Sequence, residues 1–334
     1  MKLNKIFKSH MVFAANKPVR IFGEGCGNIK ITFNGAEKVH ISENEKWVVE
    51  FPPMEYGGPY DMYIDLNGEK TVLEDIYIGD VYLFAGQSNM QFKCHESTKP
   101  QKNYNPGDMI RFYVSDRLEE GDLYNTDSGW LVCDDKVKEN ISAIGYFTSC
   151  EINEKRKNAV GAVCCYQGAS VIESWVPKDT FKNIGIDIPY ELKNGSHTCK
   201  EYSAWNGEGC LYGFAFSKLA PFSFTAVVWY QGESDHYYEE AKVYAKELAA
   251  LIDVWREDLM DNTLPFIIIQ LADYESSEID KKGWERLQEA QIEICDLRQN
   301  VYSVVCRDVC EKEGIHPPTK DKLAHRIADK LEKI

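Results

Sequence analysis

A small polar cluster, Gly86, Gln87, Ser88 and Asn89, ends the apolar run in the segment LFAGQSNMQF (83–92). A plain turn would need only the glycine, or the glycine and the asparagine. A serine at the corner between a strand and a turn can act as a nucleophile if an imidazole accepts its proton and hydrogen-bond donors stabilise the oxyanion. The segment therefore predicts a nucleophile at Ser88, and other parts of the chain must supply its partners.

The chain has seven histidines, and His316 has the most suitable surroundings for a general base. It lies in a loop after the last predicted strand, between a glycine and a pair of prolines. Glu313 precedes it by three residues, which is close enough in a tight turn to orient the ring. By contrast, His236 is expected to cap a helix, and His325 lies within the last predicted helix. The sequence therefore favours His316 as the base.

Five apolar runs separated by helical patterns would position these side chains. The runs are 80–86, 159–167, 224–231, 264–272 and 301–306. Continuous apolar runs suit strands covered on both faces, and their alternation with helices predicts a doubly wound, mainly parallel α/β sheet. Ligands bind outside the carboxyl ends of such strands. The polar clusters at 86–89, 167–170 and 231–234 should therefore converge near His316.

The first 75 residues follow a different pattern. Short alternating runs are separated by Asn-Gly and Gly-Gly-Pro turn signals, which predict β-hairpins. We therefore expect a small N-terminal β-sandwich-like domain over 1–75 and an α/β domain over 76–334. Thr319 is the expected N-cap of the last helix. Trp175 and Trp229 could belong either to the core or to the site.

Composition excludes several classes of function. The formal net charge of -15, without a block of Lys and Arg, argues against binding to a nucleic-acid backbone. No run approaches 18 apolar residues, so no membrane span is expected, and the apolar run near the start is short for a secretory leader. Eleven cysteines without a C-x-x-C pair predict reduced thiols and a cytoplasmic location. No Cys/His cluster has the spacing of a metal site.

Three motifs in order carry a resemblance to a known family: GQSNM (86–90), WYQGES (229–234) and IHP (315–317). They resemble the sialate O-acetylesterase-like branch of the SGNH (GDSL-type) hydrolases. The segment GASVIESW (168–175) is similar to that family's Gly-Gly-Thr-x-Ile-x-x-Trp block, and the N-terminal part resembles the β-domain that precedes the hydrolase domain. The resemblance implies a flavodoxin-like three-layer sandwich with a five-stranded parallel sheet.

The resemblance also implies roles for individual residues. Ser88 would be the nucleophile, His316 the general base, and Glu313 would stand where the family carries the Asp of its Asp-x-x-His block. Because Glu is longer than Asp, a backbone carbonyl or Glu233 could orient His316 instead. The implied oxyanion hole consists of the amides of Ser88 and Gly168 and the side chain of Gln231. The residues expected to bind substrate or support the site are Gln87, Asn89, Gln167 and Glu233.

The implied activity is that of a serine ester hydrolase that removes O-acetyl groups from a carbohydrate through an acetyl-enzyme, with no metal or organic cofactor. An acetylxylan esterase or another sugar acetylesterase is an alternative. A different class is also possible, namely a carbohydrate-binding protein in which the catalytic site is vestigial. The identity of the sugar, the hydroxyl that carries the acetyl group and the oligomeric state stay open at this point.

Overall fold

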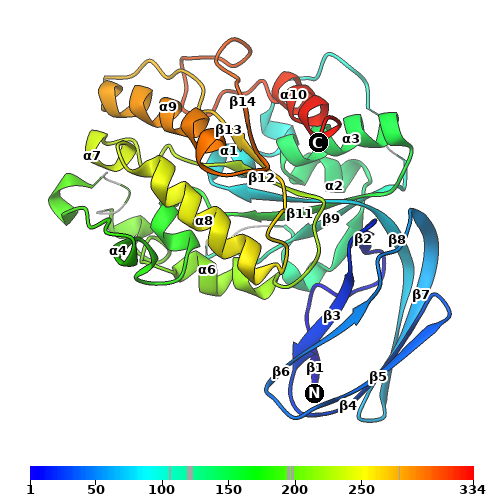
Figure 1. The fold of residues 1–334 in the computed structure, drawn as a ribbon. Helices are drawn as coiled ribbons and strands as arrows, with labels where there is room; N and C mark the ends of the chain where they lie inside the picture. The colour runs from blue at the N-terminus through cyan, green and yellow to red at the C-terminus, as the bar shows by residue number, and fades with distance from the viewer. Residues whose placement is uncertain (105–106, 119–122, 194–195, 197–198, 278) are drawn as a thin grey trace.

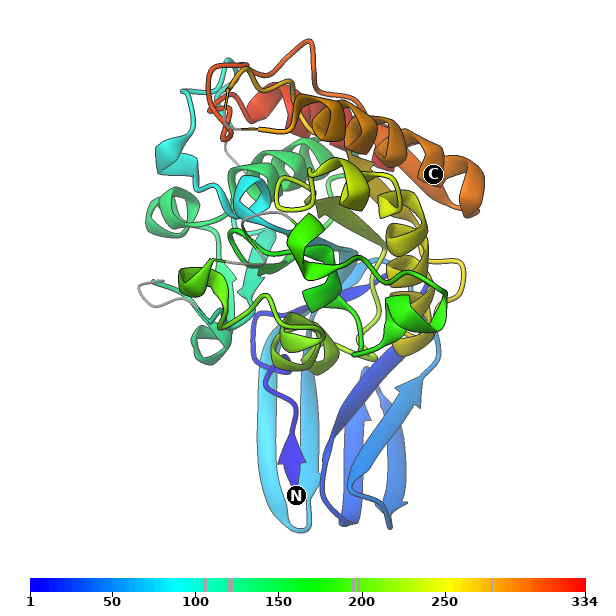
Figure 2. The same cartoon turned by 90° about the vertical axis from the view of Figure 1, so that its left-hand side faces the viewer.

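The computed structural model describes residues 1–104, 107–118, 123–193, 196, 199–277 and 279–334. Most of the molecule is an α/β body with helices on both faces of a large sheet, and the N-terminal strands extend from one end of it (Figure 1). Figure 2 shows the same strands below the helices in a view turned by 90°. Among the described residues, no helix is both long and apolar enough to cross a bilayer.

The central sheet has the strand order β10-β9-β11-β8-β12-β13-β14. Its strands are β8 (Glu69–Gly86), β9 (Ile110–Val114), β10 (Trp130–Val132), β11 (Val160–Tyr166), β12 (Ala226–Tyr230), β13 (Phe266–Ile269) and β14 (Val301–Val304). Every neighbouring pair from β9 to β14 is parallel, and β10 pairs antiparallel with β9 at the edge. The predicted α/β class with a mainly parallel sheet is confirmed.

The prediction of five parallel strands was wrong, because β9 adds a further one beside β11. Arg111, the second residue of this strand, interrupts the apolar run that would have indicated it. The structure nevertheless buries this side chain. Its guanidinium lies 3.1 Å from the Asp75 carboxylate and 5.2 Å from the centre of the Tyr77 ring. A carboxylate and an aromatic face replace the water that a buried cation would lose.

Helices form the two outer layers: α3 packs against α10, and α8 packs against α9, on opposite faces of the sheet (Figure 1). The helices are α1 (Ser88–Gln91), α2 (Asp135–Asn140), α3 (Ala143–Arg156), α4 (Thr180–Asn183), α6 (Cys210–Phe214), α7 (Tyr238–Ala241), α8 (Tyr244–Asp258), α9 (Lys281–Leu297) and α10 (Asp321–Leu331). Short 3₁₀ helices span Cys94–Glu96, Thr126–Ser128, Ile172–Trp175, Tyr190–Leu192, Lys200–Tyr202 and Phe216–Lys218. The N-cap of α10 is Lys320 rather than the predicted Thr319, whose hydroxyl donates to Glu311 instead.

The N-terminal strands form two groups. They are β1 (Lys2–Leu3), β2 (Val12–Ala14), β3 (Val19–Glu24), β4 (Gly27–Phe33), β5 (Ala36–Ser42), β6 (Lys46–Phe51) and β7 (Gly57–Leu66). One sheet has the order β1-β3-β6, while β4 pairs with β5 and β7, and β7 pairs with β8. Because β8 is one continuous strand across residue 75, it belongs to both parts of the chain. The division into domains 1–75 and 76–334 stays a prediction.

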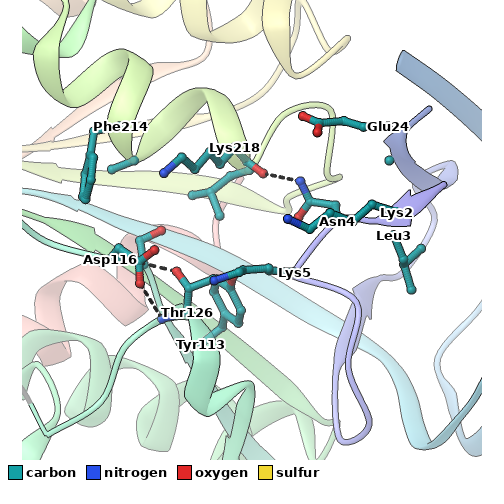
Figure 3. A pocket seen from close by; sticks show the side chains of 14 residues that line it. Lys2, Leu3, Asn4, Lys5, Glu24, Tyr113, Asp116, Thr126, Phe214 and Lys218 are labelled. Atoms are coloured by element: carbon teal, nitrogen blue, oxygen red, sulfur yellow. Dashed lines mark hydrogen bonds between the residues drawn. The ribbon is translucent and has the colours of Figure 1, made fainter. Parts of the chain in front are cut away.

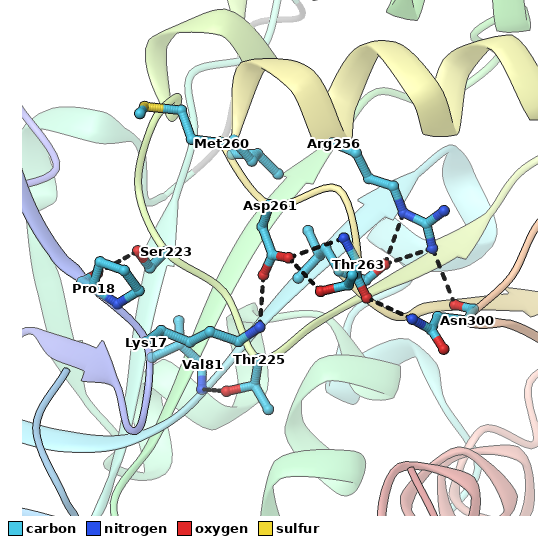
Figure 4. Close-up of polar contacts among 12 residues, drawn as sticks. Lys17, Pro18, Val81, Ser223, Thr225, Arg256, Met260, Asp261, Thr263 and Asn300 are labelled. Carbon is cyan, nitrogen blue, oxygen red and sulfur yellow. Dashed lines mark hydrogen bonds and ion pairs between the residues drawn. The ribbon is translucent and has the colours of Figure 1, made fainter.

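Polar contacts join the N-terminal part to the α/β body. The Lys17 ammonium lies 2.6 Å from the Asp261 carboxylate, and the Ser223 hydroxyl donates to the carbonyl of Pro18 (Figure 4). A cavity of about 240 Å³ opens at another point of the same junction (Figure 3). There, the Asn4 amide donates to the carbonyl of Lys218. The residues that line this cavity do not include Ser88 or His316.

The core of the α/β body contains the two tryptophans that the sequence left open. The rings of Trp175 and Trp229 are fully buried, with centroids 5.8 Å apart in an edge-to-face arrangement. They are therefore core residues, not a platform for a sugar. All eleven cysteines are free thiols, and Cys164 and Cys165 are buried in β11 as expected.

Candidate active site

The register of three strands brings distant polar segments to one edge of the sheet. Gly86, the last residue of β8, pairs with Tyr166 of β11 on one side and with Tyr230 of β12 on the other. The chain needs a glycine here, because its φ is +137° and a Cβ would lie 2.0 Å from the carbonyl oxygen of Tyr230. The segments that follow all three strands therefore begin at the same level, as the sequence predicted.

Ser88 and His316 meet at this edge. Ser88 is the first residue of α1, and His316 lies in the loop between β14 and α10. The Ser88 hydroxyl oxygen lies 2.7 Å from His316 Nε2, which is hydrogen-bond distance. A neutral imidazole with its proton on Nδ1 can accept the serine proton at this position. The structure thus brings together the two residues that the sequence pairs as nucleophile and base.

The environment of His316 favours the neutral ring. Loss of water around the imidazole lowers its pKa, and the positive charge of Lys320 lowers it further, while Glu96 opposes both. A base must be deprotonated before it can take a proton, so both of the larger effects keep His316 ready to act at neutral pH.

The predicted role of Glu313 is not supported by its position. Its side chain is exposed, and its carboxylate accepts a hydrogen bond from the backbone N–H of Lys312, 3.1 Å away. The Glu313 carboxylate therefore binds the backbone of the preceding residue and not the His316 ring. Glu233, the alternative partner, binds Asn89. Within the described ranges, His316 Nδ1 has no hydrogen-bond acceptor, so the site is a Ser–His pair there.

Two backbone amides are available beside Ser88 for an oxyanion. A Cβ placed on Gly168 would lie 3.8 Å from the Cβ of Ser88, so this glycine borders the serine. In the part of the chain that the structure describes, neither the Ser88 nor the Gly168 amide has an acceptor. The two amides therefore lie beside Ser88 without a described acceptor, and their role as an oxyanion hole stays a prediction.

Gln231 is placed differently from the prediction. Its side chain is fully buried, and its amide nitrogen donates to the carbonyl of Ser170, 2.9 Å away, and to the Asp235 carboxylate. Its amide oxygen accepts a bond from the Tyr244 hydroxyl at 2.7 Å. Both N–H groups are therefore occupied, and donation to an oxyanion would require the side chain to leave these partners. In this conformation Gln231 holds the segment after Gly168.

The side chains of Gln87 and Gln167 bind the backbone of neighbouring loops. The Gln87 amide oxygen accepts the backbone N–H groups of Gly232 and Ser234, at 3.1 and 3.4 Å. The Gln167 side chain is fully buried, and its oxygen accepts the N–H of Leu118 at 3.0 Å. Both side chains therefore hold neighbouring loops, and contact with a substrate stays a prediction for them.

Asn89 is the centre of a buried network. Its amide nitrogen donates to Glu233 Oε1 at 2.5 Å and to the carbonyl of Ile315 at 2.9 Å. Its amide oxygen accepts from the ammonium of Lys320 at 2.6 Å. The sequence reasoning missed Lys320. The only available signal was a lysine four residues after the candidate base, at the start of an amphipathic helix.

The fold and the site together define a class: an α/β protein with a serine–imidazole pair and free amides at the carboxyl edge of a parallel sheet, an arrangement suited to acyl transfer. The chain belongs to the family described as "Carbohydrate esterase, sialic acid-specific acetylesterase", whose model matches residues 78–333.

Individual relatives agree with this membership. The chain is 25% identical to sialate O-acetylesterase of Homo sapiens over 329 residues, which cover 86% of this chain and 60% of that protein. It is 23% identical to the protein of the same name from Rattus norvegicus over an aligned length of 335 residues. This match covers 84% of this chain and 62% of that protein. The chain thus spans about 60% of the length of these curated relatives.

A solved structure extends the comparison to the fold. A carbohydrate acetylesterase from Xanthomonas citri matches with a TM-score of 0.80 and 25% identity, over 98% of this chain and 73% of that one. This match includes the N-terminal strands as well as the α/β body, because it covers nearly the whole chain.

Proposed function

We propose that this protein is an esterase that removes O-acetyl groups from a carbohydrate, with an acetyl-enzyme on Ser88 as its intermediate. The observation that carries the proposal is the 2.7 Å contact between the Ser88 hydroxyl and His316 Nε2, beside two free amides. Membership in the acetylesterase family supports the choice of an acetyl ester.

The reaction follows from the geometry in two halves. In the first, His316 Nε2 takes the Ser88 proton while the serine oxygen attacks the acetyl carbonyl, and the amides of Ser88 and Gly168 stabilise the oxyanion. The tetrahedral intermediate then collapses, and the imidazolium gives its proton to the departing sugar oxygen. In the second half, water attacks the acetyl-enzyme in the same way, which releases acetate and restores Ser88.

An O-acetylated sialic acid is the first substrate to test, because the family model and the named relatives are described by that sugar. Acetylxylan and acetylated monosaccharides are the alternatives, since the Xanthomonas citri structure is described only as a carbohydrate acetylesterase. The experiment measures acetate release from this panel together with hydrolysis of p-nitrophenyl acetate. We expect wild type to hydrolyse p-nitrophenyl acetate and at least one sugar.

The decisive variant is Ser88→Ala, which should abolish both activities. Ser217→Ala is the matched control, because the Ser217 hydroxyl donates to the carbonyl of Gly213 and is not part of the site. Full activity in Ser88→Ala would disprove the nucleophile. A wild-type protein that binds a glycan of the panel and releases no acetate would instead support the alternative of a vestigial site.

A further inference from the structure

Lys320 is a buried cation without an ion-pair partner in the described part of the chain. Its side chain is fully buried at the start of α10, and no described carboxylate lies within 4.0 Å of its ammonium. The ammonium donates to Asn89 Oδ1 at 2.6 Å, and it lies 4.8 Å from the ring centre of Phe92 and 5.7 Å from that of Tyr230. Burial of a charge is costly unless it is bonded, so these contacts compensate only in part.

The Asn89 amide lies between two opposite charges. The ammonium of Lys320 contacts its oxygen, and the carboxylate of Glu233 contacts its nitrogen. The other amide hydrogen points to the carbonyl of Ile315, the residue before His316. Lys320 binds the amide oxygen and Glu233 binds the amide nitrogen, so the Asn89 amide cannot turn over. Its second N–H group therefore stays directed at the carbonyl oxygen of Ile315.

This bond holds the loop that carries the base. No described acceptor lies at His316 Nδ1, so no carboxylate orients the ring from behind. The position of the imidazole then depends on its backbone and on Phe92, whose ring centre is 6.3 Å away. Asn89 follows Ser88 in α1, so the bond from the Asn89 side chain to the Ile315 carbonyl links the residue after the nucleophile to the residue before the base.

Other titratable groups face this network. Burial lowers the pKa of Lys320 to about 8, and Cys310, Glu233, Cys306 and Glu311 oppose the shift. Burial also raises the pKa of Glu233, while its bond to Asn89 and the charge of Lys320 lower it. At neutral pH most of the Lys320 side chains therefore carry a charge.

We propose that Lys320 is a positioning residue: through Asn89 it holds His316 against Ser88, and its charge disfavours a second positive charge on the imidazole. The inference rests on the proposed function only in that Ser88 and His316 perform the chemistry. It assigns to a buried lysine the orienting task for which the sequence suggested Glu313.

The test compares Lys320→Met, which keeps the length of the side chain and removes its charge, with Lys322→Met. Lys322 is exposed in the same turn of α10 and is the matched control. The first readout is the rate at which a fluorophosphonate labels Ser88, because this reaction needs the Ser–His pair and no sugar. We expect labelling to slow by about 10- to 100-fold in Lys320→Met, since small misplacements of catalytic groups cost that much, and to stay unchanged in Lys322→Met.

The second readout is the pH dependence of labelling, which a purely structural lysine would not move. Because the charge of Lys320 lowers the pKa of His316, its removal should shift the acid limb to higher pH. A folded Lys320→Met that labels within about twofold of wild type, with the same acid limb, overturns the proposal. If Lys320→Met does not fold, Asn89→Ala replaces it, and wild-type labelling in that variant overturns the proposal equally.

The outcome also separates this inference from the proposed function. Wild-type protein that is labelled at Ser88 but releases acetate from no sugar refutes the proposed function alone. Wild-type labelling in folded Lys320→Met, with acetate release intact, refutes the role of Lys320 alone.

Discussion

Two buried polar networks support the two halves of the Ser88 site, and they differ in how their charges are balanced. On the side of the base, the amide of Asn89 lies between one cation, Lys320, and one anion, Glu233. Opposite charges on a shared amide stabilise each other, so this network keeps its hydrogen bonds while both groups are ionised.

On the side of the oxyanion amides, the network is rich in carboxyl groups. Asp235 accepts hydrogen bonds from the Gln231 side chain and from the backbone N–H of Ile172, and so holds the segment after Gly168. Glu173, Glu240 and Glu247 are buried near it, and Lys193 lies 2.7 Å from Glu173. Burial, together with the neighbouring carboxyl groups, raises the pKa of both Asp235 and Glu247.

The two halves of one site therefore depend on pH in different ways. On the base side, burial lowers the pKa of Lys320 to about 8, so this network should lose its positive charge as the pH rises above that value. On the oxyanion side, burial and the neighbouring carboxyl groups raise the pKa of Asp235 and Glu247 and so favour their protonated forms, because several carboxylates in a small buried space would repel one another.

The largest effect is expected from removal of the base. His316→Asn should lower kcat by about 10²- to 10⁴-fold, because the amide cannot take up the Ser88 proton. His325→Asn is the control, since His325 lies on α10 near Glu151 and Asp329 and not at the site. Kinetics with an acetylated sugar measure the loss. A His316→Asn variant with wild-type kcat would contradict the assignment of the base.

A smaller loss is expected on the oxyanion side. Gly168→Ala places a methyl group 3.8 Å from the Ser88 Cβ and 3.2 Å from Gln91 Oε1, where it crowds the oxyanion. We expect kcat to fall by about 10- to 100-fold, less than the roughly 10²–10³ for loss of a donor. Gly213→Ala is the control, because its Cβ would have no neighbour within 4 Å. Equal kcat in Gly168→Ala and Gly213→Ala would show that Gly168 does not border the reacting group.

The third prediction concerns stability. A folded-state pKa above the unfolded value gives stability that is fully present below the unfolded pKa and is lost as pH rises through the folded pKa. Burial raises the pKa of Glu247 well above its usual range, so wild type should lose stability as the pH rises above that usual range, by up to about 1.4 kcal/mol per pH unit for one proton.

Glu247→Gln should flatten this dependence, because the amide does not titrate. Glu257→Gln, on the exposed part of the same helix, should leave it unchanged. Denaturant unfolding at several pH values measures the difference. The same slope in Glu247→Gln as in wild type would show that the titration of Glu247 is not linked to folding.

The smallest effect is expected from Glu96, which raises the pKa of His316 from an exposed position. Glu96→Gln should move the acid limb of kcat/KM slightly to lower pH at low ionic strength. Salt screens exposed charges over about 10 Å at 0.1 M, so the shift should disappear at high salt. A shift to higher pH, or one that persists in salt, would be inconsistent with this origin.

The sequence predicted the parts of the fold that depend on local pattern. Five apolar runs correspond to strands, since a strand buried on both faces needs continuous apolar residues. The strand that was missed, β9, contains Arg111, which is buried only because Asp75 from β8 and its neighbour Tyr77 are close in space. No local pattern could have indicated that compensation.

In the candidate site too, the positions of some residues could be predicted from the sequence and the contacts of others could not. Ser88, Gly168 and His316 follow from motifs at strand ends, because parallel strands with a common register must deliver their carboxyl ends to one edge. Glu313 was assigned by its spacing from His316 and Gln231 by the family resemblance, and neither of these fixes where a side chain points. The backbone N–H of Lys312 donates a hydrogen bond to the Glu313 carboxylate, and the Gln231 amide donates one to the Asp235 carboxylate.

The sequence by itself therefore determined the class of the sheet, the edge at which the site lies and the pair Ser88 and His316. Only the tertiary structure decided what orients that pair. Lys320 and Glu233 are 87 residues apart in the chain, and they meet through Asn89, which is 144 residues from Glu233. A charge is tolerated in the interior only where a partner of matching geometry arrives from another element, and that partner is set by packing and not by spacing along the chain.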